Sequence, residues 1–150
     1  MKKFTARLIL IIIISFGFYT VNGQVNNKGI KDLSPQVKAA FQKIYTSTSE
    51  ESWTIVDKTI IISFKSGSDF YDAFFDEKGV WLRSELAILY AQLPKPVQDS
   101  LTSGEFSNWE KGSVYKVDLP DSGENYKIYV YSKDWNEMEV NFDKSGKRIL

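Results

Sequence analysis

The chain contains the same order of elements twice, and this internal repetition restricts its fold more than any other feature. Phe75-Asp76-Glu77-Lys78-Gly79 is echoed by Phe142-Asp143-Lys144-Ser145-Gly146, and each segment connects two runs that are typical of β-strands. A segment that begins with proline precedes each set of strand-like runs. Isolated hairpins are marginally stable, because they bury little apolar surface. We therefore expect the two units to form one antiparallel sheet that both helices cover.

Two helices are predicted, one before each set of strand-like runs. Ser34-Pro35 places a hydroxyl cap before a proline at the first helical position. Apolar residues then recur three or four positions apart, which is typical of one buried helix face: Val37, Ala40, Phe41 and Ile44. The second helix begins in Leu93-Pro94-Lys95-Pro96-Val97 and extends to about Ser103, with Leu101 on its apolar face. Gly104 then predicts its end.

Eight runs rich in β-branched and aromatic residues predict strands that are separated by hairpin turns. They are Trp53–Val56, Thr59–Phe64, Phe70–Phe75, Val80–Leu89, Val114–Leu119, Tyr126–Tyr131, Trp135–Phe142 and Lys147–Leu150. The predicted fold class is therefore α+β, a tandem repeat of one helix plus a four-stranded antiparallel sheet. The first unit covers about residues 34–92 and the second about residues 93–150, with both helices on one face of the sheet.

Cysteine and histidine are both absent, and this limits the chemistry of the chain. Without cysteine there is no disulfide, no thiolate nucleophile and no cysteine-bound zinc. Without histidine there is no imidazole acid–base group near neutral pH and no histidine-bound metal. We therefore predict no catalytic residues, no metal and no cofactor, and we do not expect an enzyme.

The first 23 residues have the pattern of a cleavable signal peptide. Lys2, Lys3 and Arg7 precede an apolar run that is too short for a membrane-spanning helix of about 20 residues. We expect cleavage after Gly23, with a retained N-terminal anchor as the alternative. The absence of cysteine excludes a lipoprotein anchor, so the mature protein is expected to be periplasmic or secreted, without membrane insertion. Residues 24–33 are polar and predict a flexible lead into the domain.

The part of the chain that follows the signal peptide is slightly acidic. Three of the 19 basic residues lie in residues 1–23, which leaves 16 basic residues against 19 acidic ones. A broad basic surface is the usual means of binding a phosphate backbone. Nucleic acid is therefore not an expected partner.

One face of the predicted sheet collects aromatic side chains. Alternate residues of a strand point to opposite faces, and Met138, Val140 and Phe142 mark the face toward the helices. The same alternation, aligned on the two Phe-Asp turns, places Asp72 and Lys127 at the edges of the other face. We predict partner contacts there from Ile61, Phe70, Phe74, Trp81, Arg83, Tyr129 and Tyr131. Aromatic side chains together with arginine are typical of protein-recognition surfaces.

Four explanations of this aromatic face are open. It binds a partner, or it associates with a second copy of the chain. Alternatively, the aromatic residues only stabilise the sheet, since cross-strand aromatic pairs contribute roughly 0.2–1 kcal/mol each. Coverage of the face by the N-terminal segment is a further alternative.

The combination of these motifs resembles a known family. Its features are a proline-led helix start such as Pro35-Gln36-Val37, a tryptophan before the first strand, two Phe-Asp-x-x-Gly hairpins, and Leu93-Pro94 between the halves. They resemble the PepSY-like proteins, short exported bacterial proteins that are abundant in Bacteroidetes and have a β-lactamase-inhibitor-like (BLIP-like) fold. The resemblance spans about residues 34–150 and implies an α+β fold of tandem repeats.

The resemblance also implies that the chain binds another protein as an inhibitor or regulator. The expected partner is an unidentified protein or peptide of the cell envelope, bound through the aromatic face. The alternatives are a periplasmic sensor or carrier of a small ligand, such as a glycan or peptide fragment, and a structural homodimer. A deep pocket between sheet and helices would favour the carrier, whereas a broad, shallow face would favour the protein binder.

Overall fold

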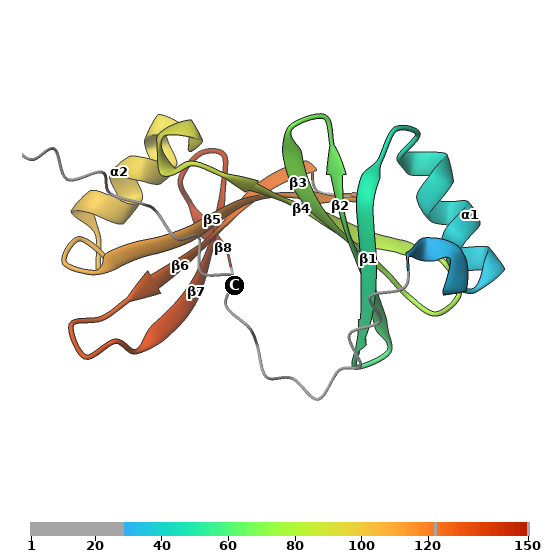
Figure 1. Ribbon diagram of the computed structural model, residues 1–150. Helices are drawn as coiled ribbons and strands as arrows, with labels where there is room; N and C mark the ends of the chain where they lie inside the picture. The colour runs from blue at the N-terminus through green and yellow to red at the C-terminus, as the bar shows by residue number, and fades with distance from the viewer. Residues whose placement is uncertain (1–28, 122, 150) are drawn as a thin grey trace, which may run out of the picture.

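Eight antiparallel strands form one sheet, and their spatial order is their order in the sequence (Figure 1). The computed structural model describes residues 29–121 and 123–149. The strands are β1 (Ser49–Val56), β2 (Thr59–Ser66), β3 (Asp69–Phe75), β4 (Trp81–Ile88), β5 (Glu110–Leu119), β6 (Gly123–Tyr131), β7 (Glu137–Asp143) and β8 (Arg148–Ile149). The predicted α+β class, an antiparallel sheet with two helices, is confirmed. The predicted signal peptide, residues 1–23, lies outside the described residues.

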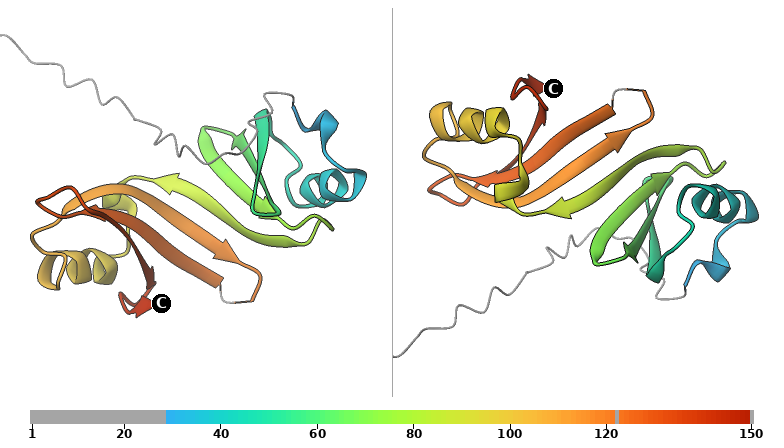
Figure 2. Two further views of the ribbon diagram at one scale, coloured as in Figure 1. Left: turned by 90° about the horizontal axis from the view of Figure 1, so that it is seen from below. Right: turned by 90° about the horizontal axis from the view of Figure 1, so that it is seen from above.

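Two α-helices lie at opposite ends of the sheet (Figure 2). They are α1 (Pro35–Ile44) and α2 (Lys95–Ser103), and each follows a short 3₁₀ turn, η1 (Ile30–Asp32) or η2 (Tyr90–Gln92). Helix α1 begins as its sequence predicts, because the backbone N–H of Val37 donates to Ser34 Oγ at 3.4 Å and Pro35 occupies the first helical position. Within the described ranges, no helix is long and apolar enough to span a membrane.

A buried leucine anchors the connection that enters each helix. Leu33 follows η1 and Leu93 follows η2, and their side chains are 7% and 3% exposed. The backbone N–H of each leucine also closes its 3₁₀ turn. The described end of the lead predicted to be flexible, residues 29–33, therefore forms structure. Burying a leucine side chain contributes roughly 1.5–3 kcal/mol to folding stability. The polar composition of residues 24–33 does not reveal that Leu33 is buried.

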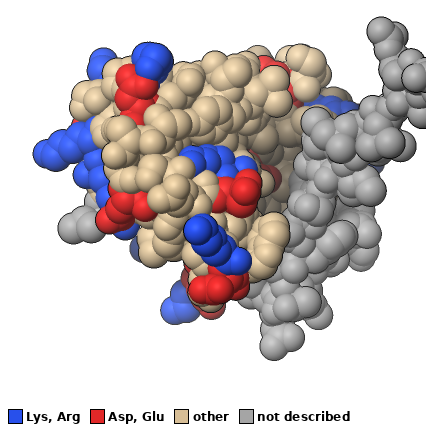
Figure 3. Space-filling model, turned by 90° about the vertical axis from the view of Figure 1, so that its left-hand side faces the viewer, with Lys and Arg blue, Asp and Glu red and all other residues tan. Residues whose placement is uncertain are grey.

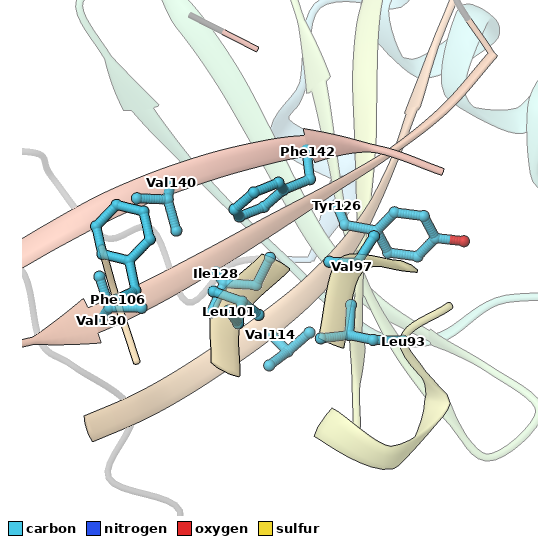
Figure 4. Close-up of a cluster of buried hydrophobic side chains, with 10 residues drawn as sticks. All are labelled: Leu93, Val97, Leu101, Phe106, Val114, Tyr126, Ile128, Val130, Val140 and Phe142. Atoms are coloured by element: carbon cyan, nitrogen blue, oxygen red, sulfur yellow. The ribbon is translucent and has the colours of Figure 1, made fainter. Parts of the chain in front are cut away.

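Each helix packs against strands that follow it, so the sheet carries two separate cores. The first core contains Leu33, Val37, Phe41, Ile60, Ile62, Phe64, Ala73 and Phe75. The second core, drawn in Figure 4, contains Leu93, Val97, Leu101, Phe106, Val114, Tyr126, Ile128, Val130, Val140 and Phe142. In both cores the strands contribute alternate residues, as the two-residue period of a strand requires.

The two Phe-Asp turns have the same hydrogen bonds. Asp76 Oδ1 accepts the backbone N–H groups of Lys78 and Val80 at 2.9 and 2.8 Å. Asp143 Oδ1 accepts those of Ser145 and Lys147 at 2.8 and 3.1 Å. A short aspartate side chain that bonds to the backbone two residues later is a common turn-forming device. The similarity of these segments in the sequence therefore extends to their conformation.

The glycine of each Phe-Asp turn lies against a helix. Gly79 and Gly146 have φ angles of +86° and +81°, in the left-handed region that favours glycine. A Cβ atom on Gly79 would lie 2.9 Å from the carbonyl oxygen of Gln36 in α1, and one on Gly146 would lie 2.4 Å from that of Pro96 in α2. Both turns thus contact the first turn of the helix in their own half of the chain.

Several strand boundaries differ from the sequence prediction. Strand β5 begins at Glu110 rather than Val114, and strand β6 begins at Gly123 rather than Tyr126. Strand β1 begins at Ser49 rather than Trp53, because a register shift between Ser49 and Ser52 keeps this polar segment in the sheet. Strand β7 begins at Glu137 rather than Trp135, because Trp135 adopts a φ of 60° and belongs to the preceding turn. Neither a register shift nor a left-handed tryptophan has a local sequence signal.

Candidate binding face

The side of the sheet opposite the two cores forms the helix-free face. Strand pairing places Ile61, Phe74 and Arg83 in one row across β2, β3 and β4. The face continues across the junction of the halves, where Glu85 of β4 pairs with Val117 of β5. Its residues are Ile61, Ser63, Lys65, Phe70, Asp72, Phe74, Arg83, Glu85, Ala87, Glu110, Tyr115, Val117, Asn125, Lys127, Tyr129, Tyr131, Glu137, Glu139 and Asn141.

The predicted position of Trp81 on this face is wrong. The pairing of β3 with β4 shifts so that Phe74 lies opposite Arg83 but Phe75 lies opposite Trp81, which leaves Leu82 as an extra residue. This bulge turns Trp81 to the helix side, where its ring packs against the first core and its Nε1–H donates to Ser84 Oγ at 2.8 Å. Alternation counted from the sequence assumes an unbroken ladder, and a one-residue bulge reverses the faces.

The other six residues of the predicted set lie on the helix-free face. They are Ile61, Phe70, Phe74, Arg83, Tyr129 and Tyr131. They do not form one cluster, because Phe70 and Tyr131 lie near the tips of two different hairpins whereas Phe74 lies near the centre. Phe70 is 51% exposed, and Phe74 is 7% exposed. Whether any of them contacts a partner stays a prediction.

Paired charges occupy the centre of the helix-free face. Glu85 and Lys127 are only 5% and 9% exposed, and Lys127 Nζ donates to Glu85 Oε2. Arg83 Nε donates to the other oxygen of Glu85, at 2.8 Å. Glu85 therefore accepts from two cations, as a buried carboxylate requires if its desolvation is to be offset. The sequence did not reveal its role, because Lys127 comes from another hairpin.

Asp72 lies beside Glu85 in the same row of the sheet. Its partner is Ser63, whose hydroxyl donates to Asp72 Oδ1 at 2.5 Å. Burial raises the pKa of Asp72 above its usual range, because the ionised carboxylate loses water, and the negative charge of Glu85 adds to this. The Ser63 hydrogen bond and the nearby Lys127 act in the opposite direction.

The two cations of the centre also contact aromatic rings. The Arg83 guanidinium lies 3.6 Å from the ring centroid of Phe74. Lys127 Nζ lies 4.7 Å from the centroid of Tyr115 and 5.6 Å from that of Tyr129, whose rings meet edge to face. Cation–π contacts of this kind hold both partners in place. The centre of the face is therefore a fixed arrangement of charges and rings.

The surface hollows of the described part are small and open to solvent. One of about 200 Å³ lies at the edge of the helix-free face and is lined by Ile61, Phe74 and Arg83 together with the β1–β2 turn. Another of about 360 Å³ lies between the end of α2 and the β7–β8 turn, beside the Arg148–Glu105 ion pair. Figure 3 views this end of the molecule, where basic and acidic side chains are interspersed.

The buried carboxylates of the described residues organise the helix-free face. Among these residues, no three acidic side chains lie close enough together to hold a metal ion. The buried carboxylates of the helix-free face are engaged by Arg83, Lys127 and Ser63, so their charges are used to fix the surface. The geometry thus defines a class of protein: a single antiparallel sheet with one preorganised face and two helices.

A family model described as "Putative beta-lactamase-inhibitor-like, PepSY-like" matches residues 58–149. The chain belongs to this family, as the resemblance of its motifs implied. None of the curated proteins compared with the chain matches it.

Solved structures of Bacteroides proteins have a similar fold. A DUF2874 family protein from Bacteroides uniformis superposes with a TM-score of 0.72 at 18% identity, covering 78% of this chain and 86% of that chain. A protein from Bacteroides eggerthii described as one of the "putative periplasmic proteins" gives 0.71 at 17%, covering 79% and 86%. A BLIP-like protein from Bacteroides fragilis gives 0.69 at 17%, covering 79% and 84%. At these identities the likeness establishes the fold.

Proposed function

We propose that this chain is an exported, non-catalytic protein that binds another polypeptide on its helix-free face and thereby inhibits or regulates an envelope or secreted protein. The observation that carries the proposal is the preorganised centre of the face, where Glu85 holds Arg83 and Lys127 against aromatic rings. The family description and the periplasmic neighbour support export and a binding role. The signal peptide in residues 1–23 is part of this proposal.

The architecture behind this function is a tandem repeat with both helices on one face of the sheet. Two observations support it: the same hydrogen bonds in the turns after Phe75 and Phe142, and the contact of each turn with the helix of its own half. Strand register also supports it. Ser84 lies beside the first core and pairs with Asp118 of β5. Lys116 lies two residues from Asp118, hence on the same face of β5, and pairs with Tyr126 of the second core. Helices on one side leave the other side of the sheet without a covering helix among the described residues.

A polypeptide partner fits this face better than a small ligand does. The face extends from Ile61 in β2 to Glu139 in β7, and aromatic residues together with arginine are the types enriched at protein interfaces. The space between the sheet and the helices is filled by side chains such as Phe41 and Leu101, which have no exposed surface. The hollow beside Phe74 is smaller than the roughly 300–1,000 Å³ of typical small-molecule sites, and the hollow of about 360 Å³ at the end of α2 lies outside this face.

The fixed centre also favours tight binding. Side chains that are ordered before association lose less conformational freedom when they bind, and each immobilised long side chain costs roughly 0.5–1.5 kcal/mol. Arg83 and Lys127 are already held by Glu85 and by rings. We therefore place the centre of the contact around Arg83 and Lys127, with Phe70 and Tyr131 at its two ends.

Affinity capture with matched variants tests the proposal. The full chain, purified as its expressing cells process it, serves as bait against an envelope extract. A face variant carries Ile61→Ser, Phe70→Ser and Tyr129→Ser. A control variant carries Ile44→Ser, Ile55→Ser and Met138→Ser, which removes exposed apolar side chains of α1 and of the helix side of the sheet. Both variants are first shown to be folded by circular dichroism.

The expected result is a protein retained by the wild type and by the control variant and lost with the face variant. Equal retention by all three baits would place the contact elsewhere. Failure of the wild-type bait to retain any protein, while an oligosaccharide or peptide fragment raises its melting temperature, would favour the carrier. Concentration-dependent mass in sedimentation, lost with the face variant, would favour the homodimer.

A further inference from the structure

The hollow at the end of α2 has the size of a small-molecule site. Its volume is about 360 Å³, within the roughly 300–1,000 Å³ of typical sites. Its walls come from the last turn of α2, from the residues that follow this helix and from the β7–β8 turn. Phe106 and Phe142 of the second core, labelled in Figure 4, line it, so it lies on the helix side of the sheet. The first half of the chain shows why the second half has this hollow.

The residue that follows each helix differs between the halves. The two Phe-Asp turns contact the carbonyl oxygens of Gln36 in α1 and Pro96 in α2, and these contacts align the two helices. Counting the same distance along the chain from each contact leads to Tyr45 in the first half and to Glu105 in the second. A tyrosine ring at the end of one helix therefore corresponds to a carboxylate at the end of the other.

The residue that opens the strand after each Phe-Asp turn differs as well. Trp81 pairs with Phe75 at the start of β4, and Arg148 pairs with Phe142 at the start of β8. Both phenylalanines belong to the cores, so both residues lie on the helix side of the sheet. An indole in the first half therefore corresponds to a guanidinium in the second.

In the first half the two rings fill this place. The ring centroid of Tyr45 lies 4.6 Å from that of Phe64 and 5.3 Å from that of Phe41. Trp81 packs against the same core, and its Nε1–H donates to Ser84 Oγ at 2.8 Å. The Ser84 hydroxyl also forms a hydrogen bond with the Tyr45 hydroxyl. Tyr45 and Trp81 are thus connected through one serine and cover the end of their core.

In the second half an ion pair stands where the two rings stand in the first. Arg148 Nη1 donates to Glu105 Oε1, and the guanidinium lies 5.2 Å from the ring centroid of Phe106. The side chains of Arg148 and Glu105 are 42% and 61% exposed. Both residues line the hollow. The hollow is therefore the space that two rings occupy in the first half, bordered by paired charges of both signs.

The ion pair is able to bind further polar groups. A guanidinium has five N–H donors and a carboxylate has two acceptor oxygens, so one hydrogen bond between them uses a small part of their capacity. Arg148 Nη2 lies 4.0 Å from Met138 Sδ, which is a weak acceptor. The matching ligand group is a zwitterion, because its carboxylate accepts from Arg148 while its ammonium donates to Glu105. It also adds no net charge to the pair.

We propose that the hollow binds a free aromatic α-amino acid. The ring of the ligand lies against Phe106 and Phe142, its carboxylate contacts Arg148 and its ammonium contacts Glu105. The ring thereby takes the place that Tyr45 and Trp81 fill in the first half. The hollow lies on the side of the sheet opposite the helix-free face, so this inference does not depend on the proposed function.

Nuclear magnetic resonance on the ¹⁵N-labelled full chain tests the site. The probes are phenylalanine, alanine, 3-phenylpropionate, which lacks the ammonium group, and phenethylamine, which lacks the carboxylate. The readout is the backbone N–H signals of Gly104 and Gly146, which line the hollow, with Gly67 as a distant reference. Phenylalanine should shift both signals saturably, with a dissociation constant on the order of 1 mM, as expected for a small ligand in an open site. The two analogues should bind about fivefold more weakly, and alanine should give no saturable shift.

Two variants distinguish ligand contact from a structural role of the ion pair. Glu105→Gln should remove the preference for phenylalanine over 3-phenylpropionate, and Arg148→Gln should remove its preference over phenethylamine. A structural role would weaken all three ligands alike in both variants. Asp99→Asn is the matched control, because it breaks another exposed ion pair of α2, with Lys95, and should leave all affinities unchanged.

A third variant fills the hollow with the side chains of the first half. Glu105→Tyr/Arg148→Trp, shown to be folded by circular dichroism, should no longer bind phenylalanine. If this variant does not fold, the two glutamine variants decide. The inference would be overturned by equal affinities for phenylalanine and alanine, by signals of Gly104 and Gly146 that phenylalanine does not shift, by equal weakening of all ligands in both glutamine variants, or by unchanged binding in the filled variant.

Discussion

The two halves of the sheet are alike at one end of their hairpins and different at the other. At the Phe-Asp end, Gly79 and Gly146 have similar φ angles and each lies against the first turn of a helix. At the opposite end, Lys65 is paired with Glu50 and Phe70, whereas Tyr131 contacts the ring of Trp135 and donates to Glu137. The shared end maintains the fold, because backbone geometry leaves it little freedom. The differing end carries the exposed aromatic side chains Phe70 and Trp135.

The cores of the two halves also differ in composition. Phe41 of the first core contacts the rings of Tyr45, Phe64 and Phe75, with centroid distances of 5.3, 5.0 and 6.3 Å. The corresponding helix of the second half contributes Val97 and Leu101 to a largely aliphatic cluster. Two side-chain compositions thus support the same arrangement of one helix on strands, as expected when volume and pattern matter more than identity.

The largest effect is expected from truncation of the aromatic core. Phe41→Ala should lower the free energy of unfolding by roughly 3–5 kcal/mol, because it leaves a cavity and removes three ring contacts. Leu101→Ala, the matched change in the second core, should cost less, about 2–4 kcal/mol. Urea denaturation followed by circular dichroism measures both. An equal or larger loss for Leu101→Ala would show that the aromatic contacts add nothing.

The next largest effect concerns the charge pair that connects β4 with β6. Lys127→Met should destabilise the protein by about 2–3 kcal/mol, below the roughly 3–5 kcal/mol for an isolated buried charge, because Arg83 still donates to Glu85. Adding Glu85→Gln should recover part of this loss, since a neutral amide tolerates burial better than an unpaired carboxylate. Urea denaturation of the wild type, the two single variants and the double variant gives the coupling. Additive losses in the double variant would argue against an ion pair that depends on both partners.

The Phe-Asp turns provide a graded test of the shared end. Gly79→Ala and Gly146→Ala should each cost about 2 kcal/mol, since a left-handed alanine costs roughly 1–2 kcal/mol and the new Cβ meets a helix carbonyl. Gly146→Ala should be the worse, because its contact is 2.4 Å rather than 2.9 Å. Gly67→Ala is the control, since a Cβ there meets nothing within 4 Å. Thermal unfolding that ranks Gly67→Ala with the others would contradict helix contact as the cause.

The smallest effect is the pH dependence at Asp72. Its folded-state pKa is raised by burial, so the folded protein binds this proton more tightly than the unfolded chain does. Asp72 therefore contributes to folding stability at pH values below the usual pKa range of aspartate. This contribution is lost as the pH rises through the raised pKa of the folded protein. Asp72→Asn should increase stability at neutral pH, with the gain disappearing at acid pH. A gain that persists at acid pH would show that this carboxyl does not titrate as described.

Much of the fold could be predicted from local patterns. Ser34-Pro35 predicts the start of α1. The Phe-Asp turns predict the register of β7 with β8, and they predict that of β3 with β4 only up to the bulge. The predicted face of Trp81 is wrong because Leu82 is an extra residue in the pairing of β3 with β4. Such a bulge depends on how the strands pair and not on the residues next to Leu82 in the sequence. Alternation therefore predicts faces reliably only within an unbroken ladder.

The candidate site was less predictable than the fold. The aromatic residues of the face could be found because they are strand formers with a two-residue period. The burial of Glu85 could not be found, because it depends on Lys127 from a hairpin 42 residues away in the sequence. Tryptophan is common in strands, so the sequence predicts that a strand begins at Trp135. The left-handed conformation that places Trp135 in the turn has no local sequence signal.

Hydroxyl-radical footprinting of the full chain, alone and with its captured partner, tests the central claim most directly. The account predicts that the partner protects the side chains of Phe70, Tyr129, Tyr131 and Trp135 from oxidation. It also predicts unchanged oxidation of Ile44, Ile55 and Met138, which are exposed on α1 and on the helix side of the sheet. Protection of Ile44, Ile55 and Met138 with unchanged oxidation of the four aromatic residues would contradict binding on the helix-free face.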